Sequence, residues 1–199
     1  MADQSGKREL ETGQLRLVVG LGNPGRKYAE TRHNIGWAVL AELARKYGTS
    51  NPKDKFRGEL IEANLDGQRV LLLAPHTFMN DSGQSVLEAR DFYKIPQSKV
   101  LVVCDDFSLP VQKLRMRSSG SAGGQNGLDD VLRRLGTNQI ARLRIGIGPV
   151  PNGWDAAAFV LGKFNKEEKK QIEETVWQAA DAVAVWATSG LEDAMNRFN

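Results

Sequence analysis

The sequence predicts a single α/β domain in which helices cover both faces of a mixed, mostly parallel β-sheet. Three short segments, 17–21, 68–74 and 99–104, are apolar runs typical of buried strands. Segments with helical periodicity alternate with the strands, and an Asp-Gly pair at 66–67 predicts a tight hairpin. A chain of 199 residues can bury roughly 70% of its unfolded surface, so one domain over 14–199 can form its own core.

The first half of the chain is predicted to run strand, loop, helix and hairpin. The strand at 17–21 ends in a turn that two glycines and a proline impose at 22–25. Apolar residues at helical spacing then predict a helix over 35–47, which a glycine stops. The segments on either side of the Asp-Gly pair, 57–65 and 68–74, predict the two hairpin strands.

The second half adds further strands and helices in alternation. Residues 113–117 alternate basic and apolar side chains, which suits a strand with one wet face. Four glycines over 118–127 are too many for regular structure and predict a loop. The other predicted elements are a loop at 75–83, a helix from Val86 to Tyr93, strands at 99–104 and 141–147, a short helix ending at Leu135, a long helix over 166–188 and a short helix after Gly190.

The composition is that of an ordinary soluble globular protein. Hydrophobic residues make up 41% and charged residues 26% of the chain, and no apolar segment approaches the roughly 20 residues of a membrane span. The first 13 residues are polar and mixed in charge, so we expect a disordered tail and no signal peptide. A single cysteine, Cys104, excludes an intrachain disulfide and a cysteine-rich metal site, and indicates a cytoplasmic protein.

Basic residues concentrate in the segment 113–144. It holds seven Lys and Arg residues against two Asp residues, an excess of five, compared with +3 for the whole chain. Such clustering is the electrostatic mark of a polyanion site. On strands, Arg115 and Arg117 share one face, as do Arg142 and Arg144. These stripes are either ordinary solvated faces or, beside a glycine-rich loop with free N–H groups, a phosphate site.

Two polar residues that follow the first strand, Asn23 and His33, are candidates for a functional site. In open α/β sheets, ligands bind beyond the carboxyl ends of the strands, where this loop lies. Histidine titrates close to neutral pH, so His33 suits a general base, although a surface or capping histidine is the alternative. A carboxylate commonly fixes the tautomer of such a base. Asp105 and Asp106 both follow a central strand, and the pattern does not decide between them.

Asn23, Asn80 and Asn126 each lie in a turn or loop where a strand is predicted to end. An asparagine amide offers two donors and an acceptor without charge, which suits a peptide group or an oxyanion, while its preference for turns is the alternative explanation. No Gly-x-Ser-x-Gly motif is present, Cys104 lies in an apolar strand, and the histidines and cysteine lack metal-ligand spacing. A hydrolase with this sequence would use water directly, activated by a His–Asp pair.

The segment 20–25 matches the dinucleotide fingerprint Gly-x-Gly-x-x-Gly. That fingerprint requires a helix that begins within the glycines, so that its amino end faces a pyrophosphate. Here Pro24 and Gly25 prolong the turn, and helical periodicity starts only near Ile35. We therefore expect no dinucleotide, and the alternative of a dinucleotide enzyme predicts that the chain binds NAD.

A series of motifs resembles those of bacterial-type peptidyl-tRNA hydrolases, in that family's order from Leu17 to Phe198. The matching pieces are Val-Val-Gly-Leu-Gly-Asn-Pro-Gly at 18–25, Tyr28, Thr-Arg-His-Asn at 31–34, Thr-Phe-Met-Asn at 77–80, Asp105, and the segments 109–110, 120–124, 126–128, 142–148 and 159–161. The resemblance implies a single α/β domain and a cytoplasmic, monomeric esterase without metal or cofactor. Its implied partner is peptidyl-tRNA, bound at the acceptor stem and 3′ CCA end and cleaved between the peptide and the 3′ ribose. No membrane or obligate protein partner is implied.

The resemblance also implies roles for individual residues. His33 is the general base that activates water, and Asp105 holds it in its basic form. Asn23 is similar to the residue that discriminates blocked from free aminoacyl groups. The implied contacts to the peptidyl-tRNA end are Tyr28, Phe78, Met79, Asn80 and Asn126, and those to the acceptor-stem phosphates are Arg115, Arg117 and Arg144.

Two departures from the family pattern affect these expectations. Many members have histidine where this chain has Gln125, so we expect weakened or retuned activity, with the His33–Asp105 pair intact. The chain ends at Asn199 without the basic tail of many members, which implies weaker tRNA binding and a shallower salt dependence. A non-catalytic RNA-binding scaffold is the main alternative, because relatives in plant organelles serve in intron splicing.

Overall fold

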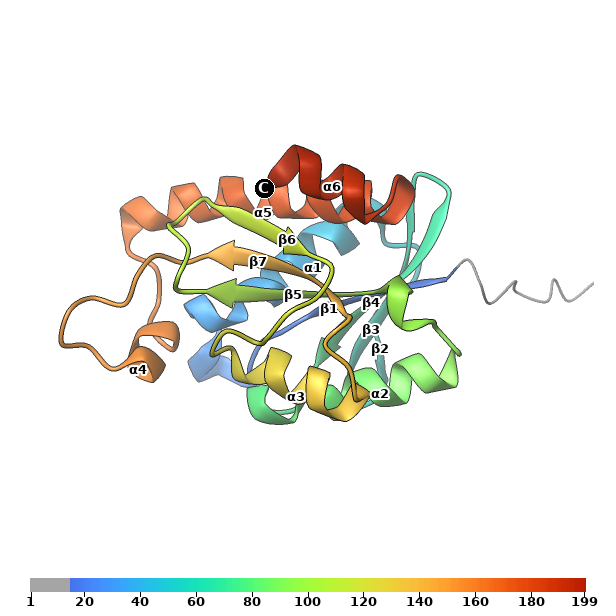
Figure 1. The fold of residues 1–199 in the computed structure, drawn as a ribbon, viewed down its shortest axis with the longest axis horizontal. Helices are drawn as coiled ribbons and strands as arrows, with labels where there is room; N and C mark the ends of the chain where they lie inside the picture. The colour runs from blue at the N-terminus through green and yellow to red at the C-terminus, as the bar shows by residue number, and fades with distance from the viewer. Residues whose placement is uncertain (1–14) are drawn as a thin grey trace, which may run out of the picture.

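The structure, a computed structural model, describes residues 15–199 as seven strands in one sheet covered by helices (Figure 1). The tail predicted at 1–13 lies outside the described residues. The sheet order is β2-β3-β4-β1-β5-β7-β6. The strands are β1 Arg16–Gly20, β2 Lys53–Lys55, β3 Gly58–Leu65, β4 Gln68–Pro75, β5 Val100–Asp106, β6 Leu114–Arg117 and β7 Ala141–Gly146.

The centre of the sheet is parallel and its two sides are antiparallel. Strand β1 pairs in parallel with both β4 and β5, and β5 pairs in parallel with β7. Strand β3 runs antiparallel to both of its neighbours, and β6 runs antiparallel to β7. Five of the seven strands therefore run in one direction, which confirms the predicted mixed, mostly parallel sheet. The carboxyl ends of β1, β4, β5 and β7 consequently meet at one edge.

The helices form a layer on each face of the sheet, as Figure 1 shows. Alternate residues of a strand point to opposite faces, so Val18 packs in the core with α1, α5 and α6, whereas Leu17 and Val19 pack in the core with α2 and α3. The helices are α1 Ile35–Tyr47, α2 Ser82–Phe92, α3 Asn126–Leu135, α4 Ala156–Val160, α5 Lys166–Thr188 and α6 Leu191–Phe198.

Close packing of α1 on β1 depends on glycine. A Cβ on Gly20 would lie 2.4 Å from the carbonyl oxygen of Gly36, in the first turn of α1. A Cβ on Gly22 would lie 2.8 Å from the Trp37 indole. The space beside two glycines of the apparent dinucleotide fingerprint, Gly20 and Gly22, is thus occupied by α1. Since that helix begins at Ile35, and only the three-residue 3-10 helix Arg26–Tyr28 directly follows Gly25, no α-helix begins among these glycines.

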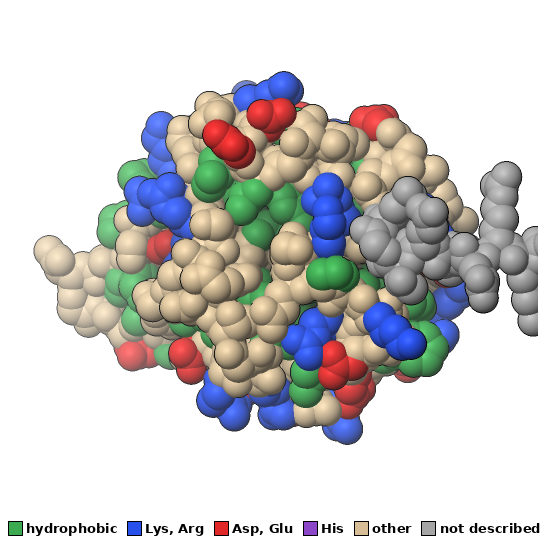
Figure 2. Space-filling view, turned by 45° about the vertical axis from the view of Figure 1, so that its right-hand side comes forward, with side chains coloured by type: hydrophobic (Ala, Val, Ile, Leu, Met, Phe, Trp, Pro, Cys, Tyr) green, Lys and Arg blue, Asp and Glu red, His purple; other side chains and the backbone are tan. Residues whose placement is uncertain are grey.

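The predicted helices 35–47 and 166–188 have the observed bounds of α1 and α5, and the hairpin, β5, β6 and β7 lie within two residues of expectation. The short elements β2 and α4 were not predicted. Within residues 15–199, no helix is both long and apolar enough to span a membrane. Figure 2 shows acidic and basic side chains interspersed over the face that includes the amino ends of the parallel strands.

Candidate active site

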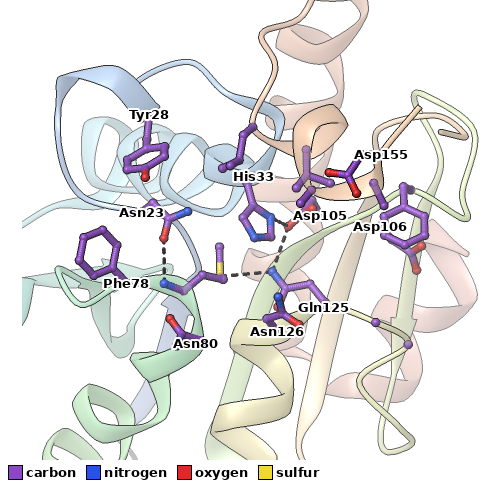
Figure 3. Close-up of a pocket in the computed structure, with 18 of the residues that line it drawn as sticks. Asn23, Tyr28, His33, Phe78, Asn80, Asp105, Asp106, Gln125, Asn126 and Asp155 are labelled. Atoms are coloured by element: carbon purple, nitrogen blue, oxygen red, sulfur yellow. Dashed lines mark hydrogen bonds and ion pairs between the residues drawn. The ribbon is translucent and has the colours of Figure 1, made fainter. Parts of the chain in front are cut away.

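A cavity of about 670 Å³ lies at the edge where the carboxyl ends of the parallel strands meet (Figure 3). Loops after β1 and β4, the end of β5 and the start of α3 supply much of its lining. The structure brings nine of the eleven sequence-derived site residues to this cavity: Asn23, Tyr28, His33, Phe78, Met79, Asn80, Asp105, Asn126 and Arg144. Arg115 and Arg117 do not line it and lie exposed on β6.

Asn23, in the turn after β1, is held by three hydrogen bonds from two other segments. The backbone N–H of Asn23 donates to Asn34 Oδ1 at 2.8 Å, and Asn34 Nδ2 donates to the Asn23 carbonyl at 2.9 Å. The Met79 N–H donates to Asn23 Oδ1, also at 2.8 Å. No described residue bonds Asn23 Nδ2, so the free end of this cavity-lining amide is a donor.

His33 lies in the short 3-10 helix Arg32–Asn34, directly before α1. Its Nδ1 is 2.9 Å from Asp105 Oδ1, and the two residues are only 8% and 2% exposed. A carboxylate in this position accepts a hydrogen bond from a protonated Nδ1, which leaves Nε2 of the neutral ring as an acceptor. No described residue bonds that Nε2. The arrangement can therefore remove a proton from a water molecule in the cavity.

The choice between the two aspartates, open in the sequence, follows from the alternation of β5. Asp105 faces His33, whereas Asp106 Oδ2 pairs with Arg144 Nη1 at 3.1 Å. Sequence reasoning missed a second partner of Asp105, because Gln125 Nε2 donates to the same Oδ1 at 3.0 Å. It also missed Asn34, whose position eleven residues after Asn23 carries no signal before the loop is folded.

Two of the asparagines and two aromatic residues leave polar or planar groups open to the cavity. Asn80 and Asn126 are exposed, and no described residue bonds their side chains. Phe78 is 60% exposed on the rim, and Tyr28 is half-buried. These groups provide amide donors and ring faces to a bound molecule.

Met79, by contrast, is buried at the cavity wall. A Cβ on Gly127 would lie 2.4 Å from Met79 Sδ, so only glycine leaves room for this packing. Because the Met79 N–H also holds Asn23 Oδ1, this contact helps to fix the amide of Asn23.

The basic stripe on β7 is buried, so its interpretation as a solvated face is wrong. Arg142 is 1% exposed and donates to the carbonyls of Ile140, Gly120 and Asn138, and this burial lowers its pKa. Arg144 is 9% exposed, and its other terminal nitrogen donates to the Ser121 carbonyl. Both arginines therefore anchor the glycine-rich loop, while Arg144 also borders the cavity.

Cys104 is a core residue, as predicted. It is fully buried in β5, and this burial raises the pKa of its thiol to about 12. The thiol is therefore protonated at neutral pH and cannot serve as a nucleophile. Among residues 15–199, no cluster of His, Cys, Asp and Glu side chains has the arrangement of a metal site.

Comparison with known proteins agrees with this geometry. The family model for peptidyl-tRNA hydrolase matches residues 17–199. The chain belongs to the peptidyl-tRNA hydrolase family. It is 51% identical to the peptidyl-tRNA hydrolase of Rhodopirellula baltica, over 93% of this chain and 97% of that protein. It is 46% identical to the enzyme of Desulfitobacterium hafniense, over 93% of this chain and all of that protein.

A solved structure of the peptidyl-tRNA hydrolase from Acinetobacter baumannii has the same fold. It superposes with a TM-score of 0.87 and 36% identity, over 94% of this chain and 95% of that chain. The resemblance inferred from the motifs and the predicted fold class are both confirmed.

Proposed function

We propose that this chain hydrolyses peptidyl-tRNA at the ester between the peptide carboxyl group and the tRNA 3′ ribose, with His33 as the general base. The observation that carries the proposal is the contact between His33 Nδ1 and the buried Asp105, with Nε2 left without a protein partner at a cavity. Family membership supplies the reaction class. The chain is proposed to act as a cytoplasmic monomer.

The reaction begins when Nε2 of His33 takes a proton from water. The resulting hydroxide attacks the ester carbonyl carbon, and a tetrahedral oxyanion forms. Asp105 stabilises the imidazolium that develops, because its carboxylate accepts from Nδ1–H. The intermediate then collapses, the bond to the ribose oxygen breaks, and the imidazolium returns its proton to that oxygen. The free Nδ2 groups of Asn80 and Asn126 are candidates to stabilise the oxyanion.

Asn23 is proposed to select peptidyl over free aminoacyl groups. Its Oδ1 is occupied by the Met79 N–H, so it presents only N–H donors to the cavity. A blocked amino group carries a carbonyl oxygen that accepts such a bond. A free α-amino group is an ammonium that can only donate, and it would face the Asn23 donor unpaired.

The tRNA itself is proposed to approach from the side of β6. Arg115 lies opposite Arg144 in the β6–β7 register, so the exposed arginines are one strand away from the cavity. Arg115 and Arg117 would contact acceptor-stem phosphates, and Arg144 would border the path of the tRNA 3′ end toward the cavity. Phe78 offers a ring on which a base of the 3′ end can stack.

The test is release of the acyl group from N-acetylated aminoacyl-tRNA, run beside the unblocked form. Rapid release from the blocked substrate and little from the free one is the expected result. Binding of tRNA without release would instead support a non-catalytic RNA-binding scaffold.

A further inference from the structure

Gln125 joins the start of a helix to the carboxylate of the His–Asp pair. It is the N-cap residue of α3, and its Oε1 accepts from the Leu128 N–H at 2.7 Å. That N–H belongs to the first turn of the helix, where backbone N–H groups have no acceptor within the helix. Because the cap requires an oxygen at one end of the amide, the other end must be the donor Nε2. The orientation of the side chain is therefore decided by the backbone.

The donor end reaches the same oxygen that holds the base. Gln125 Nε2 is 3.0 Å from Asp105 Oδ1, and His33 Nδ1 is 2.9 Å from that atom (Figure 3). Gln125 is 5% exposed and Asp105 is 2% exposed, so water competes little for either group. Nε2 also lies 3.4 Å from Met79 Sδ, next to the residue whose N–H fixes Asn23.

We propose that Gln125 is a positioning residue for the hydrolysis, which acts through Asp105 by setting how strongly that carboxylate holds the His33 imidazolium. The inference rests on the proposed role of His33. A hydrogen bond to a carboxylate favours its ionised form, so the amide keeps Asp105 charged as an acceptor for Nδ1–H. It also takes up part of the charge on Oδ1, which weakens the attraction of that oxygen for a protonated ring. Removal of the Gln125 donor would therefore let Asp105 hold the His33 imidazolium more tightly.

The other charged groups around the pair do not bond Asp105. Asp106 from β5 and Arg144 from β7 pair with each other, and Asp155, before α4, caps that helix by accepting from the Ala158 N–H. All three line the same cavity. The Cys104 thiol next along β5 is uncharged at neutral pH. Among the described side chains, only His33 and Gln125 bond the Asp105 carboxylate, so removal of Gln125 changes its donors by one.

The test replaces Gln125 by methionine, which keeps the length of the side chain and removes both donor and acceptor. In this variant His33 is the one donor left to Asp105 among the described side chains, so the carboxylate attracts the protonated ring more strongly. The acid limb of the kcat/KM profile is therefore expected to move to higher pH by roughly half to one pH unit. The loss of kcat/KM for N-acetylated aminoacyl-tRNA is therefore expected to be larger on the acid side of the profile than on the alkaline plateau. A fall in kcat at every pH, with an unmoved acid limb, would overturn the inference.

A second readout is independent of turnover. The chain has two histidines, so in a His76→Asn background the imidazole resonances report His33 alone. The midpoint of their NMR titration is expected to rise in Gln125→Met by the same amount as the acid limb. If the His33 mechanism fails in the release assay while this midpoint rises, the proposed function is wrong and the contact argument stands. If turnover depends on His33 but the midpoint is unchanged, the inference is wrong.

The matched control is Asn165→Ala, which removes the N-cap of α5 at a residue that bonds neither His33 nor Asp105. The Asn165 side chain accepts from the N–H groups of Glu167 and Glu168, so its loss destabilises a helix start without touching Asp105. It is expected to lower Tm and leave the His33 midpoint unchanged. If Gln125→Met does not fold, Gln125→Ser supplies a capping oxygen too short to reach Asp105, and the midpoint is again expected to rise. An unchanged midpoint there would overturn the inference.

Discussion

At the residue scale, the site is built from amides whose direction is fixed by the backbone. Asn23 accepts from the Met79 N–H, and Gln125 accepts from the Leu128 N–H. In both residues the oxygen is occupied, so the end that faces the cavity or the carboxylate is a donor. Selection by Asn23 and support of Asp105 by Gln125 therefore both depend on a backbone N–H that occupies the amide oxygen.

Exchange of the Asn23 amide for a carboxylate tests the selection step. In Asn23→Asp, an oxygen replaces the free Nδ2, so the donor to the peptidyl carbonyl is lost and a charge is added. We expect kcat/KM for blocked aminoacyl-tRNA to fall about 10- to 100-fold, the loss of one buried hydrogen bond. The control is Asn64→Asp in the exposed hairpin turn, where Oδ1 caps the Gly67 N–H. An unchanged ratio of blocked to unblocked turnover would contradict the role of Asn23.

Some site residues could be found from the sequence and others could not. His33 and Asn23 stand in a loop that must follow a buried strand, so their place at the sheet edge was predictable. To choose Asp105 over Asp106 one must know which face of the sheet each residue of β5 points to, and two adjacent carboxylates in a sequence do not reveal this. Gln125 was noted only as a departure from the family, since its two partners come from β5 and α3.

At the element scale, the position of His33 depends on how closely α1 packs on β1. The Gly20→Ala substitution would place a Cβ 2.4 Å from the backbone oxygen of Gly36, which cannot move without displacing the helix. We expect a loss of about 1–3 kcal/mol in the free energy of unfolding, measured by urea denaturation. The control Ala38→Ser, on the exposed face of α1, is expected to change it by less than about 0.5 kcal/mol. Equal stability of the two variants would contradict the packing argument.

The elements that were predicted well have strong patterns. The long helix α5 carries Ile172, Val176, Ala179 and Trp186 at helical spacing, and all four are buried. By contrast, β2 consists of Lys-Asp-Lys and is exposed throughout, so it has no hydrophobic pattern. Helix α4, after the loop that contains Pro149 and Pro151, has only five residues, too few for a periodic signal.

At the scale of the whole molecule, the fold divides the basic segment 113–144 into two parts. Arg142 and Arg144 are buried, and Arg133 and Arg134 pair with Asp130. Arg115 and Arg117 are exposed, and no ion pair involves either of them within residues 15–199. Elsewhere, as on the face in Figure 2, charges of both signs are mixed. The sequence excess of basic residues thus overstates the surface that can meet a polyanion.

The salt dependence of tRNA binding tests this surface. We expect Arg115→Ala to weaken binding and to lower the slope of log K against log salt by about one. The control is Arg45→Ala, on the last turn of α1, where the side chain pairs with Glu42. Its slope is expected to match that of the unmodified chain. If Arg115→Ala leaves the slope unchanged, β6 does not contact the tRNA phosphates.

The order of the strands was the part of the fold that the sequence did not reveal. Periodicity identifies a strand and its buried faces, but the neighbours of β1 come from segments more than fifty residues downstream. Those neighbours, β4 and β5, supply the loop with Phe78 and Asn80 and the carboxylate of Asp105. The convergence of the site on one cavity is therefore a property of the whole sheet.

The most direct test of the mechanism compares His33→Ala with His76→Ala, since His76 is exposed and does not line the cavity. Release from N-acetylated aminoacyl-tRNA is expected to fall about 10²- to 10⁴-fold in His33→Ala, with tRNA affinity nearly unchanged, because a general base acts in the transition state. His76→Ala is expected to keep its turnover. Full turnover by His33→Ala, or a loss explained by weaker tRNA binding, would contradict the role of His33 as the base.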